Sequence, residues 1–375
     1  MKTTKSFVIR KERGMKVITV FLLFTLTLLH SEKSITLDYK KVSSIVGDED
    51  KGSMVYDLSY FNIDKLGNIY IVDGKEKNIK VFDSSGKFLF KFGSEGQGPG
   101  EFIVPQSIVI TATNIFVADQ MGMNISKFDL KGNFIESLPA ETGVPSSIRN
   151  LGNDTLLGLD AGSDQKDGKF FVVGSLRIYD SNMKEKKVVD KFSALLDLKN
   201  PQLNPMDLLP AFCGNENSLY YGLIDENRYN IKKLDLASGE DALIKRRYRK
   251  VKISSEEIKR RKKSVTVSVQ SDRGGGSVTN EIKEKYHKAI QSMWLDKYEN
   301  LLVMPADQLY TDKVELDLFK GDKFIGKLDF SAFEVERGRG SSEHIKFCND
   351  KLYIGREDED GYPIIDIYEY SYDIK

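Results

Sequence analysis

The segment Asn68–Asp73, with the sequence NIYIVD, decides the fold because it recurs 46 residues later as Asn114–Asp119, NIFVAD. The same displacement relates three further pairs of segments: Asn78-Ile79 and Asn124-Ile125, Phe82-Asp83 and Phe128-Asp129, Gly86-Lys87-Phe88 and Gly132-Asn133-Phe134. A fainter third copy runs from Leu219 to Gly239. Self-similarity at a period of roughly 40 to 50 residues is typical of repeat architectures, so the chain is built from repeated units.

Each unit alternates apolar and polar residues in short runs, and Gly, Asn and Asp separate the runs. This alternation is the pattern of short antiparallel strands joined by tight turns. In the first unit it predicts strands at Tyr60–Asp64, Asn68–Val72, Ile79–Asp83 and Phe88–Gly93. A unit of this length with four strands is a β-propeller blade, which must stack on neighbouring blades to bury its faces.

The number of blades follows from the second strand of each unit, where an apolar run ends near an acidic residue. Six such ends occur, at Asp73, Asp119, Asp160, Asp225, Asp307 and Asp358. The last unit has only three strands of its own, and we expect Ser34–Val42 to supply the fourth and so remove an exposed sheet edge. Residues 33–375 are therefore predicted to form an all-β, six-bladed propeller with four-stranded blades, closed by its N-terminal strand.

The N-terminal residues have the pattern of an export signal. Several basic residues precede the apolar run Val17–Leu29, which is too short for a bilayer span of about 20 apolar residues. We predict a leader at residues 1–32, with Met15 as an alternative start. The mature protein is then expected in the periplasm or outside the cell, with no stable membrane span after cleavage.

A segment between blades 4 and 5, residues 245–287, interrupts the repeat. We expect a helix capped by Ser254 or Ser255, a glycine-rich link at 271–277 and a second helix at 280–293. Eleven Lys or Arg residues against two Glu lie between positions 245 and 263. This charge fits either a docking arm for an anionic partner or a solvated helix.

The loop Phe92–Phe102, FGSEGQGPGEF, followed by Pro105, resembles the inter-blade loop of NHL-repeat propellers and of related bacterial exported six-bladed propellers. The resemblance is clearest over residues 57–135 and weaker over 215–240. It implies the propeller fold. It does not imply one chemistry, because such families contain enzymes, protein or RNA binders and exported proteins.

Residues suited to metal chemistry are few. The recurring Asp73, Asp119 and Asp225 could bring oxygen ligands to Ca²⁺, but each precedes an Asn by five residues, which favours a role in the strand connection. We therefore expect no cofactor, with calcium as the one alternative. The two cysteines, Cys213 and Cys348, occupy similar contexts in separate blades and are predicted to be free thiols.

Propeller sites form on the loops around the axis, and four loops qualify: Gly93–Phe102, Gly143–Ser147, Asn204–Pro210 and Arg337–His344. The predicted binding residues are Arg337, Arg339, Glu343 and His344 on the last loop, and Arg260, Arg261, Lys262 and Lys263 in the basic insertion. No metal-ligand spacing surrounds the histidines, so no metal site is expected.

The predicted function is an exported propeller that binds or scaffolds a protein, an anionic glycan or another surface ligand. Lys plus Arg (56) equals Asp plus Glu (56), and no aromatic-rich face accompanies the basic run, so nucleic acid is not expected as a partner. The alternative is a hydrolase or lyase, with or without a metal, whose site lies at the axial loops.

Overall fold

The computed structural model describes residues 32–374 except 140–142, 154, 168, 197–209, 226, 265, 270–275, 280–285, 312 and 334–343. The chain divides into two units, Met1–Glu32 and Lys33–Lys375. Residues 1–31 of the predicted leader lie outside the described residues. Among the helices that are described, none has the length and apolar character needed to cross a membrane.

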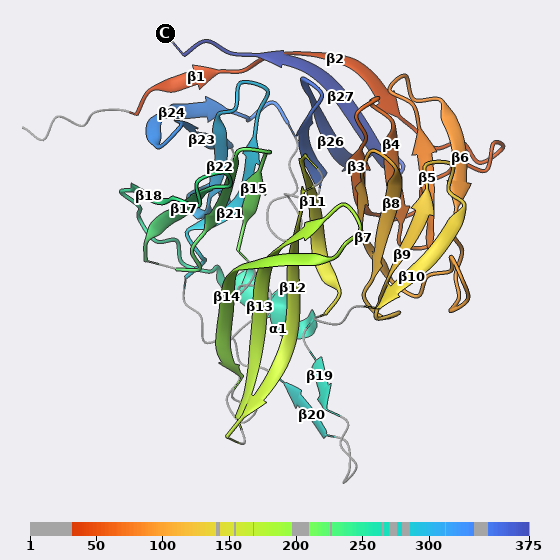
Figure 1. Cartoon of the computed structure of the whole chain (residues 1–375). Helices are drawn as coiled ribbons and strands as arrows, with labels where there is room; N and C mark the ends of the chain where they lie inside the picture. The colour runs from red at the N-terminus through yellow and green to blue at the C-terminus, as the bar shows by residue number, and fades with distance from the viewer. Residues whose placement is uncertain are drawn as a thin grey trace, which may run out of the picture. The chain divides into compact units, whose positions relative to one another are not determined.

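Residues 33–375 form six four-stranded blades, as predicted (Figure 1). Blades 1 to 3 are β3 (Leu58–Ile63), β4 (Ile69–Asp73), β5 (Asn78–Phe82), β6 (Phe88–Phe92); β7 (Pro105–Ile110), β8 (Asn114–Asp119), β9 (Asn124–Asp129), β10 (Phe134–Pro139); β11 (Pro145–Gly152), β12 (Thr155–Lys166), β13 (Lys169–Asp180), β14 (Glu185–Leu196). Blades 4 to 6 are β15 (Phe212–Gly214), β16 (Ser218–Gly222), β17 (Tyr229–Asp235), β18 (Asp241–Arg246); β21 (Ile290–Leu295), β22 (Leu301–Pro305), β23 (Glu315–Lys320), β24 (Lys323–Asp329); β25 (Ile345–Cys348), β26 (Lys351–Glu357), β27 (Pro363–Ser371) with β2 (Asp38–Ile45).

The alternation along each strand sends side chains to two different neighbouring blades. In β4, Ile69 and Ile71 pack in the core between blades 6 and 1, whereas Tyr70 and Val72 pack in the core between blades 1 and 2. Six such apolar clusters occur among the described residues, one at each blade interface. Because every blade buries both faces in this way, the ring is held together mainly by apolar burial.

The N-terminal strand closes the ring, as predicted, but it serves two blades. From Asp38 to Ile45 it pairs antiparallel with β27 as the fourth strand of blade 6. The preceding β1 (Ser34–Thr36) instead pairs parallel with β24 and adds a fifth strand to blade 5. Ile35 and Leu37 are buried in the core between these blades, so the switch preserves the burial of both side chains.

The insertion contains α1 (Ser255–Ser264) and a hairpin of β19 (Thr266–Val269) and β20 (Gly276–Thr279). The first predicted helix is confirmed, and the Ser254 hydroxyl caps it by accepting the backbone N–H of Glu257 at 3.1 Å. The predicted helix at 280–293 is wrong for its described residues, 286–293. Residues from Ile290 onward form β21, because pairing with β22 in blade 5 outweighs the local helical pattern.

The loop Gly93–Phe102 folds back on itself. The backbone N–H of Phe102 donates to Ser94 O at 2.8 Å, and the Phe102 ring is fully buried against Phe128 between blades 1 and 2. A Cβ on Gly93, whose φ is 79°, would lie 2.3 Å from that ring. Glycine is therefore required at position 93, where the loop turns.

Candidate functional site

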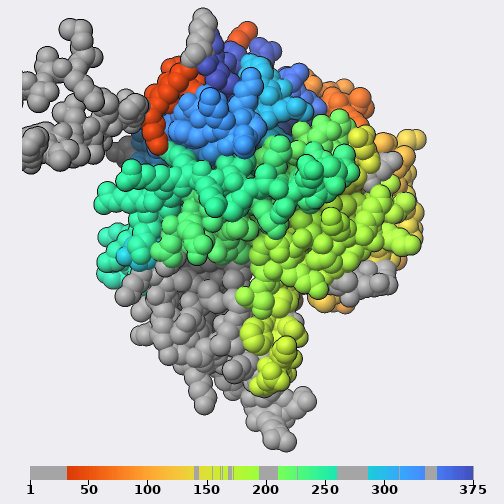
Figure 2. Space-filling model, turned by 60° about the vertical axis from the view of Figure 1, so that its left-hand side comes forward, coloured from red at the N-terminus to blue at the C-terminus, as the bar shows by residue number. Residues whose placement is uncertain are grey.

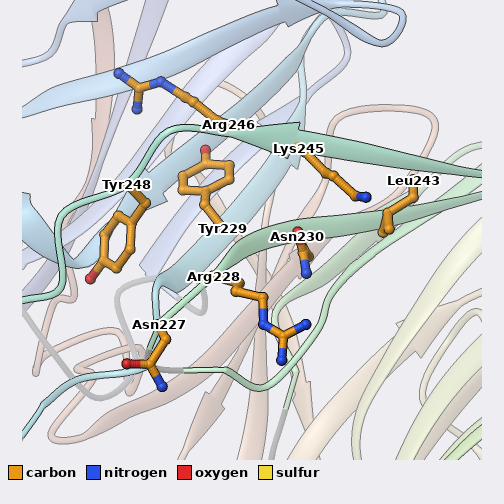
Figure 3. Close-up of a pocket in the computed structure, with 8 residues that line it drawn as sticks. All are labelled: Asn227, Arg228, Tyr229, Asn230, Leu243, Lys245, Arg246 and Tyr248. Carbon is orange, nitrogen blue, oxygen red and sulfur yellow. The ribbon is translucent and has the colours of Figure 1, made fainter.

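A pocket of about 330 Å³ opens at the end of the outer hairpin of blade 4 (Figure 3). Its lining residues are Asn227, Arg228, Tyr229, Asn230, Leu243, Lys245, Arg246 and Tyr248. The register of β17 and β18 places Tyr229 opposite Arg246 and Asn230 opposite Lys245. Side chains alternate along each strand, so these two cross-strand pairs lie on opposite faces of the hairpin.

The turn that begins the pocket is shaped by Asp225. One oxygen of its carboxylate, Oδ1, accepts the backbone N–H groups of Asn227 at 2.7 Å and Arg228 at 3.1 Å. The other, Oδ2, lies 3.1 Å from Arg228 Nε. The Asp225 carbonyl also accepts the N–H of Ala289 at 2.9 Å, which connects the turn to the start of blade 5. This aspartate therefore positions pocket residues through their backbone.

The face that carries Tyr229, Arg246 and Tyr248 turns toward blade 5. The Arg246 guanidinium forms an ion pair with the buried Asp317 and lies 4.3 Å from the centre of the Phe324 ring. Burial raises the pKa of Asp317 to about 7, although Arg246 opposes that shift. Arg246 is thus committed to the interface between blades 4 and 5 rather than to a ligand.

The opposite face carries Arg228, Asn230, Leu243 and Lys245, which point to the other side of the hairpin (Figure 3). The Arg228 side chain is 74% exposed despite its ion pair with Asp225. Lys245 is exposed and has no ion-pair partner among the described residues. Leu243 is 45% exposed and adds an apolar patch beside these polar groups. The open side of the pocket therefore presents two cations and an amide to solvent.

The positive charge continues from the pocket into the insertion. The exposed cations of this basic strip are Lys245, Arg247, Arg249, Lys250 and Lys252. Figure 2 shows blade 4 and the residues after it, in green to turquoise, as one continuous surface. Lys250 Nζ lies 3.4 Å from Asn227 Oδ1 and 3.9 Å from the centre of the Tyr286 ring, so the strip stays close to the pocket.

The root of the insertion is fixed to blade 5. The hydroxyl of Tyr310 donates to the Glu257 carboxylate of α1, and His287 Nε2 lies 2.7 Å from the same hydroxyl. Ile253 and His287 are both buried, and a bridge joins Lys252 to Tyr286. These contacts hold both described ends of the insertion on the propeller.

Of the predicted binding residues, only His344 has a side chain that the structure describes. Arg260, Arg261, Lys262 and Lys263 lie on α1, as predicted, but their side chains are outside the described residues. Arg337, Arg339 and Glu343 are also outside them. His344 Nε2 donates to the Leu58 carbonyl at 3.1 Å and so joins blade 6 to blade 1.

The recurring aspartates of blades 1 and 2 bind backbone. The Asp73 carboxylate accepts the N–H groups of Tyr56 and Lys75 at 3.0 Å and forms an ion pair with the buried Lys80 at 2.6 Å. Asp73 faces Asn78 in the strand register, as Asp119 faces Asn124. The role of these aspartates in the strand connection is confirmed, but within the described part of the chain no hydrogen bond joins the Asp and Asn side chains.

The described residues contain no group of three His, Cys, Asp or Glu side chains that could hold a metal ion. Cys213 and Cys348 are free thiols, as predicted. The pocket residues of blade 4 were missed because their grouping depends on cross-strand register. The available signal was the third repeat copy, because a hairpin at its end would bring Asn227–Asn230 next to Lys245–Tyr248, which follow the copy.

Comparison with known proteins gives a family. The domain of unknown function DUF4934 matches residues 59–265, which is more than half of the chain. The chain belongs to the DUF4934 family. No curated protein matches this DUF4934 sequence. The NHL-repeat resemblance stays a prediction.

Solved structures agree with the propeller fold of this DUF4934 protein. A "putative exported protein" of Bacteroides fragilis NCTC 9343 is 13% identical, with a TM-score of 0.53, over 90% of this chain and 99% of that one. A DUF4221 protein of Bacteroides vulgatus is 13% identical, with a TM-score of 0.50 and the same coverage. A catalytically inactive virginiamycin B lyase of Staphylococcus aureus is less similar in structure, with a TM-score of 0.39.

Proposed function

We propose that this DUF4934 protein is an exported binding module that holds an anionic glycan, bearing carboxylate or phosphate groups, in the blade 4 pocket and along the basic strip. One observation carries the proposal. Lys245, Arg247, Arg249 and Lys252 are all exposed within eight consecutive residues, and none of them has an ion-pair partner in the described part of the chain. Ionic groups left without partners on a surface are available to a charged ligand.

Each cation of the strip attracts an anionic ligand only weakly, and these attractions add along the strip. An exposed ion pair contributes about 0.2 to 1 kcal/mol, and salt screens it beyond about 8 Å at physiological ionic strength. A short row of cations can therefore hold a polyanion that presents several charges in sequence, whereas a single monovalent anion would bind weakly. The Asn230 amide and the exposed Leu243 add hydrogen bonding and apolar contact beside the charges.

Export is supported by the leader pattern of residues 1–32 and by the described character of the Bacteroides fragilis neighbour. The resemblance of the loop Phe92–Phe102 to NHL-repeat propellers is compatible with a binding role. A protein that presents an acidic surface would use the same cations. The alternative, a hydrolase or lyase with its site at the axial loops, would use Arg337–His344 or a metal. Residues 337–343 are outside the described residues.

The test compares two double variants with the same change in net charge. Lys245→Gln with Arg247→Gln removes cations from the strip. Lys320→Gln with Lys323→Gln removes two exposed cations at the tip of the β23–β24 hairpin in blade 5. We expect the first variant to elute from immobilised polygalacturonate at clearly lower salt than wild type, and the control to elute like wild type.

Equal elution of both double variants, or no retention of wild type on polygalacturonate and on a phosphorylated glycan, would overturn the proposal. Retention by vesicles of anionic lipid but by neither glycan would assign the strip to a membrane surface. Circular dichroism melting of each variant confirms that the comparison is between folded proteins.

A further inference from the structure

A second pocket, of about 520 Å³, lies on blade 6 and is independent of the blade 4 site. The N-terminal strand β2 contributes Lys41, β26 contributes Arg356 and Glu357, and β27 contributes Asp366 and Tyr368. Phe333, which follows β24 of blade 5, completes one wall. The pocket therefore exists only because the two ends of the chain meet in this blade.

A buried carboxylate forms the polar side of the blade 6 pocket. Asp366 is 1% exposed and lies 2.5 Å from Lys41 Nζ, 2.7 Å from Arg356 Nε and 2.7 Å from Ser44 Oγ. Burial alone would raise the pKa of Asp366, but these donors hold it below its usual value. Lys41 and Arg356 are thereby fixed in direction, while the Lys41 side chain remains 43% exposed with N–H groups available to a ligand.

Three aromatic rings form the apolar side. The Phe333 ring centre lies 5.1 Å from that of Tyr368 and 4.8 Å from that of Tyr39. Tyr39 is 48% exposed and extends the aromatic surface beyond the pocket. The rings contact one another, so they cannot surround a cation as an aromatic cage does, and they offer an open surface on which a flat apolar group can stack.

The charges around the blade 6 pocket have both signs. Lys41 and Arg356 line it as donors, and Glu357, Asp358 and Glu359 add three carboxylates to its lining. Glu357 and Glu359 are exposed, and among the described residues neither carboxylate has an ion-pair partner; the Glu357 carbonyl accepts from Arg356 Nη1 at 3.0 Å. An anionic ligand would be repelled by the three carboxylates, and a cationic one by the Lys41 ammonium and the Arg356 guanidinium. A neutral ligand rich in hydroxyl groups can donate to the carboxylates and accept from the cations.

We propose that the blade 6 pocket binds a neutral saccharide, with one sugar face stacked on Tyr39 and its neighbouring rings and the hydroxyl groups bonded to Lys41 and Glu357. A zwitterionic amino acid also carries groups of both signs. At side chains as exposed as these, its ion pairs would be screened by water and contribute little, whereas ring stacking is not weakened by salt. The open aromatic surface therefore favours the sugar.

Isothermal titration with maltotriose, cellotriose and xylotriose as neutral probes tests this assignment. Tyr39→Ser removes the exposed ring, and Glu357→Ala removes an acceptor without changing the rings. Tyr298→Ser is the matched control, since Tyr298 is 46% exposed and lies in the β21–β22 turn of blade 5 rather than in the pocket. Trigalacturonate and phenylalanine serve as anionic and zwitterionic probes.

At least one neutral trisaccharide is expected to bind wild type and Tyr298→Ser equally. Tyr39→Ser should weaken that binding about fivefold, as for the loss of one stacked ring. Glu357→Ala should weaken it without altering the melting temperature. Absence of binding for all three neutral probes at millimolar concentration overturns the proposal. So does an equal loss in Tyr298→Ser, or binding of phenylalanine or trigalacturonate that Tyr39→Ser abolishes.

Discussion

Replacing Asp119 by Ala tests whether the recurring aspartates fix the blades or bind calcium. The Asp119 carboxylate is 1% exposed and accepts three backbone N–H groups: Ile103 at 2.7 Å, Val104 at 2.9 Å and Gly122 at 3.0 Å. Two of these lie in the loop between blades 1 and 2, and the third lies in the turn after β8. One side chain thus joins an inter-blade loop to a turn of the next blade.

The expected loss of stability can be worked from these three bonds. Alanine leaves three buried donors without an acceptor, and each such donor costs about 1 to 3 kcal/mol. Partial relaxation brings the total to about 4 kcal/mol. For a unit of about 340 residues the unfolding entropy near the midpoint is about 0.7 kcal/mol/K, so Tm should fall by about 5 to 6 °C.

The assay is calorimetric melting of wild type and Asp119→Ala, each with CaCl₂ and with EDTA. Asp129→Ala is the control in the same blade, because Asp129 also accepts two backbone N–H groups but at an exposed turn, and we expect its Tm to fall by about 1 °C. A fall of less than 2 °C in Asp119→Ala, or calcium stabilisation that wild type shows and the variant lacks, would refute the structural role.

Three further outcomes are expected. Burial raises the pKa of Cys213 to about 12 and that of Cys348 to about 11, so both thiols should resist iodoacetamide at pH 8 until the protein unfolds, as read by mass spectrometry. Burial also raises the pKa of Asp160 to about 6. The stability that Asp160 contributes is therefore complete below about pH 4 and is lost as pH rises through 6. In urea unfolding, Asp160→Asn should be less destabilising relative to wild type at pH 8 than at pH 4. Tyr310→Phe removes the donor to Glu257, and hydrogen exchange at the His287 amide should accelerate while the blade 1 core is unchanged.

The repeat made the fold predictable because a blade is specified by local alternation. Ile69, Tyr70, Ile71 and Val72 face two different interfaces in strict alternation, and that pattern is visible in the chain itself. The switch of the N-terminal strand from β24 to β27 was not visible. Ile35, Leu37 and Tyr39 continue one uninterrupted alternation, which does not show where the hydrogen-bonding partner changes.

Neither pocket could be predicted from the sequence, because each depends on which strands pair and in which register. Asn230 meets Lys245 through the register of one hairpin, and Lys41 meets Asp366 across almost the whole chain. The cations of the insertion were visible as a run. Which of them are exposed without partners, and which, like Arg246, are held by a buried carboxylate from the next blade, depends on packing that no local pattern encodes.

The sharing of blade 6 between the two ends of the chain sets the order in which this protein can fold. The Ser44 hydroxyl meets Asp366 across a separation of 322 residues, so β2, among the first strands to be synthesised, has no partner in blade 6 until β27 is made. Contacts of such long range slow folding because the chain must close its largest loop before they form. A chain that still lacks its last strand can complete individual hairpins but cannot close the ring. Ring closure is therefore a property of the finished chain rather than of any growing part of it.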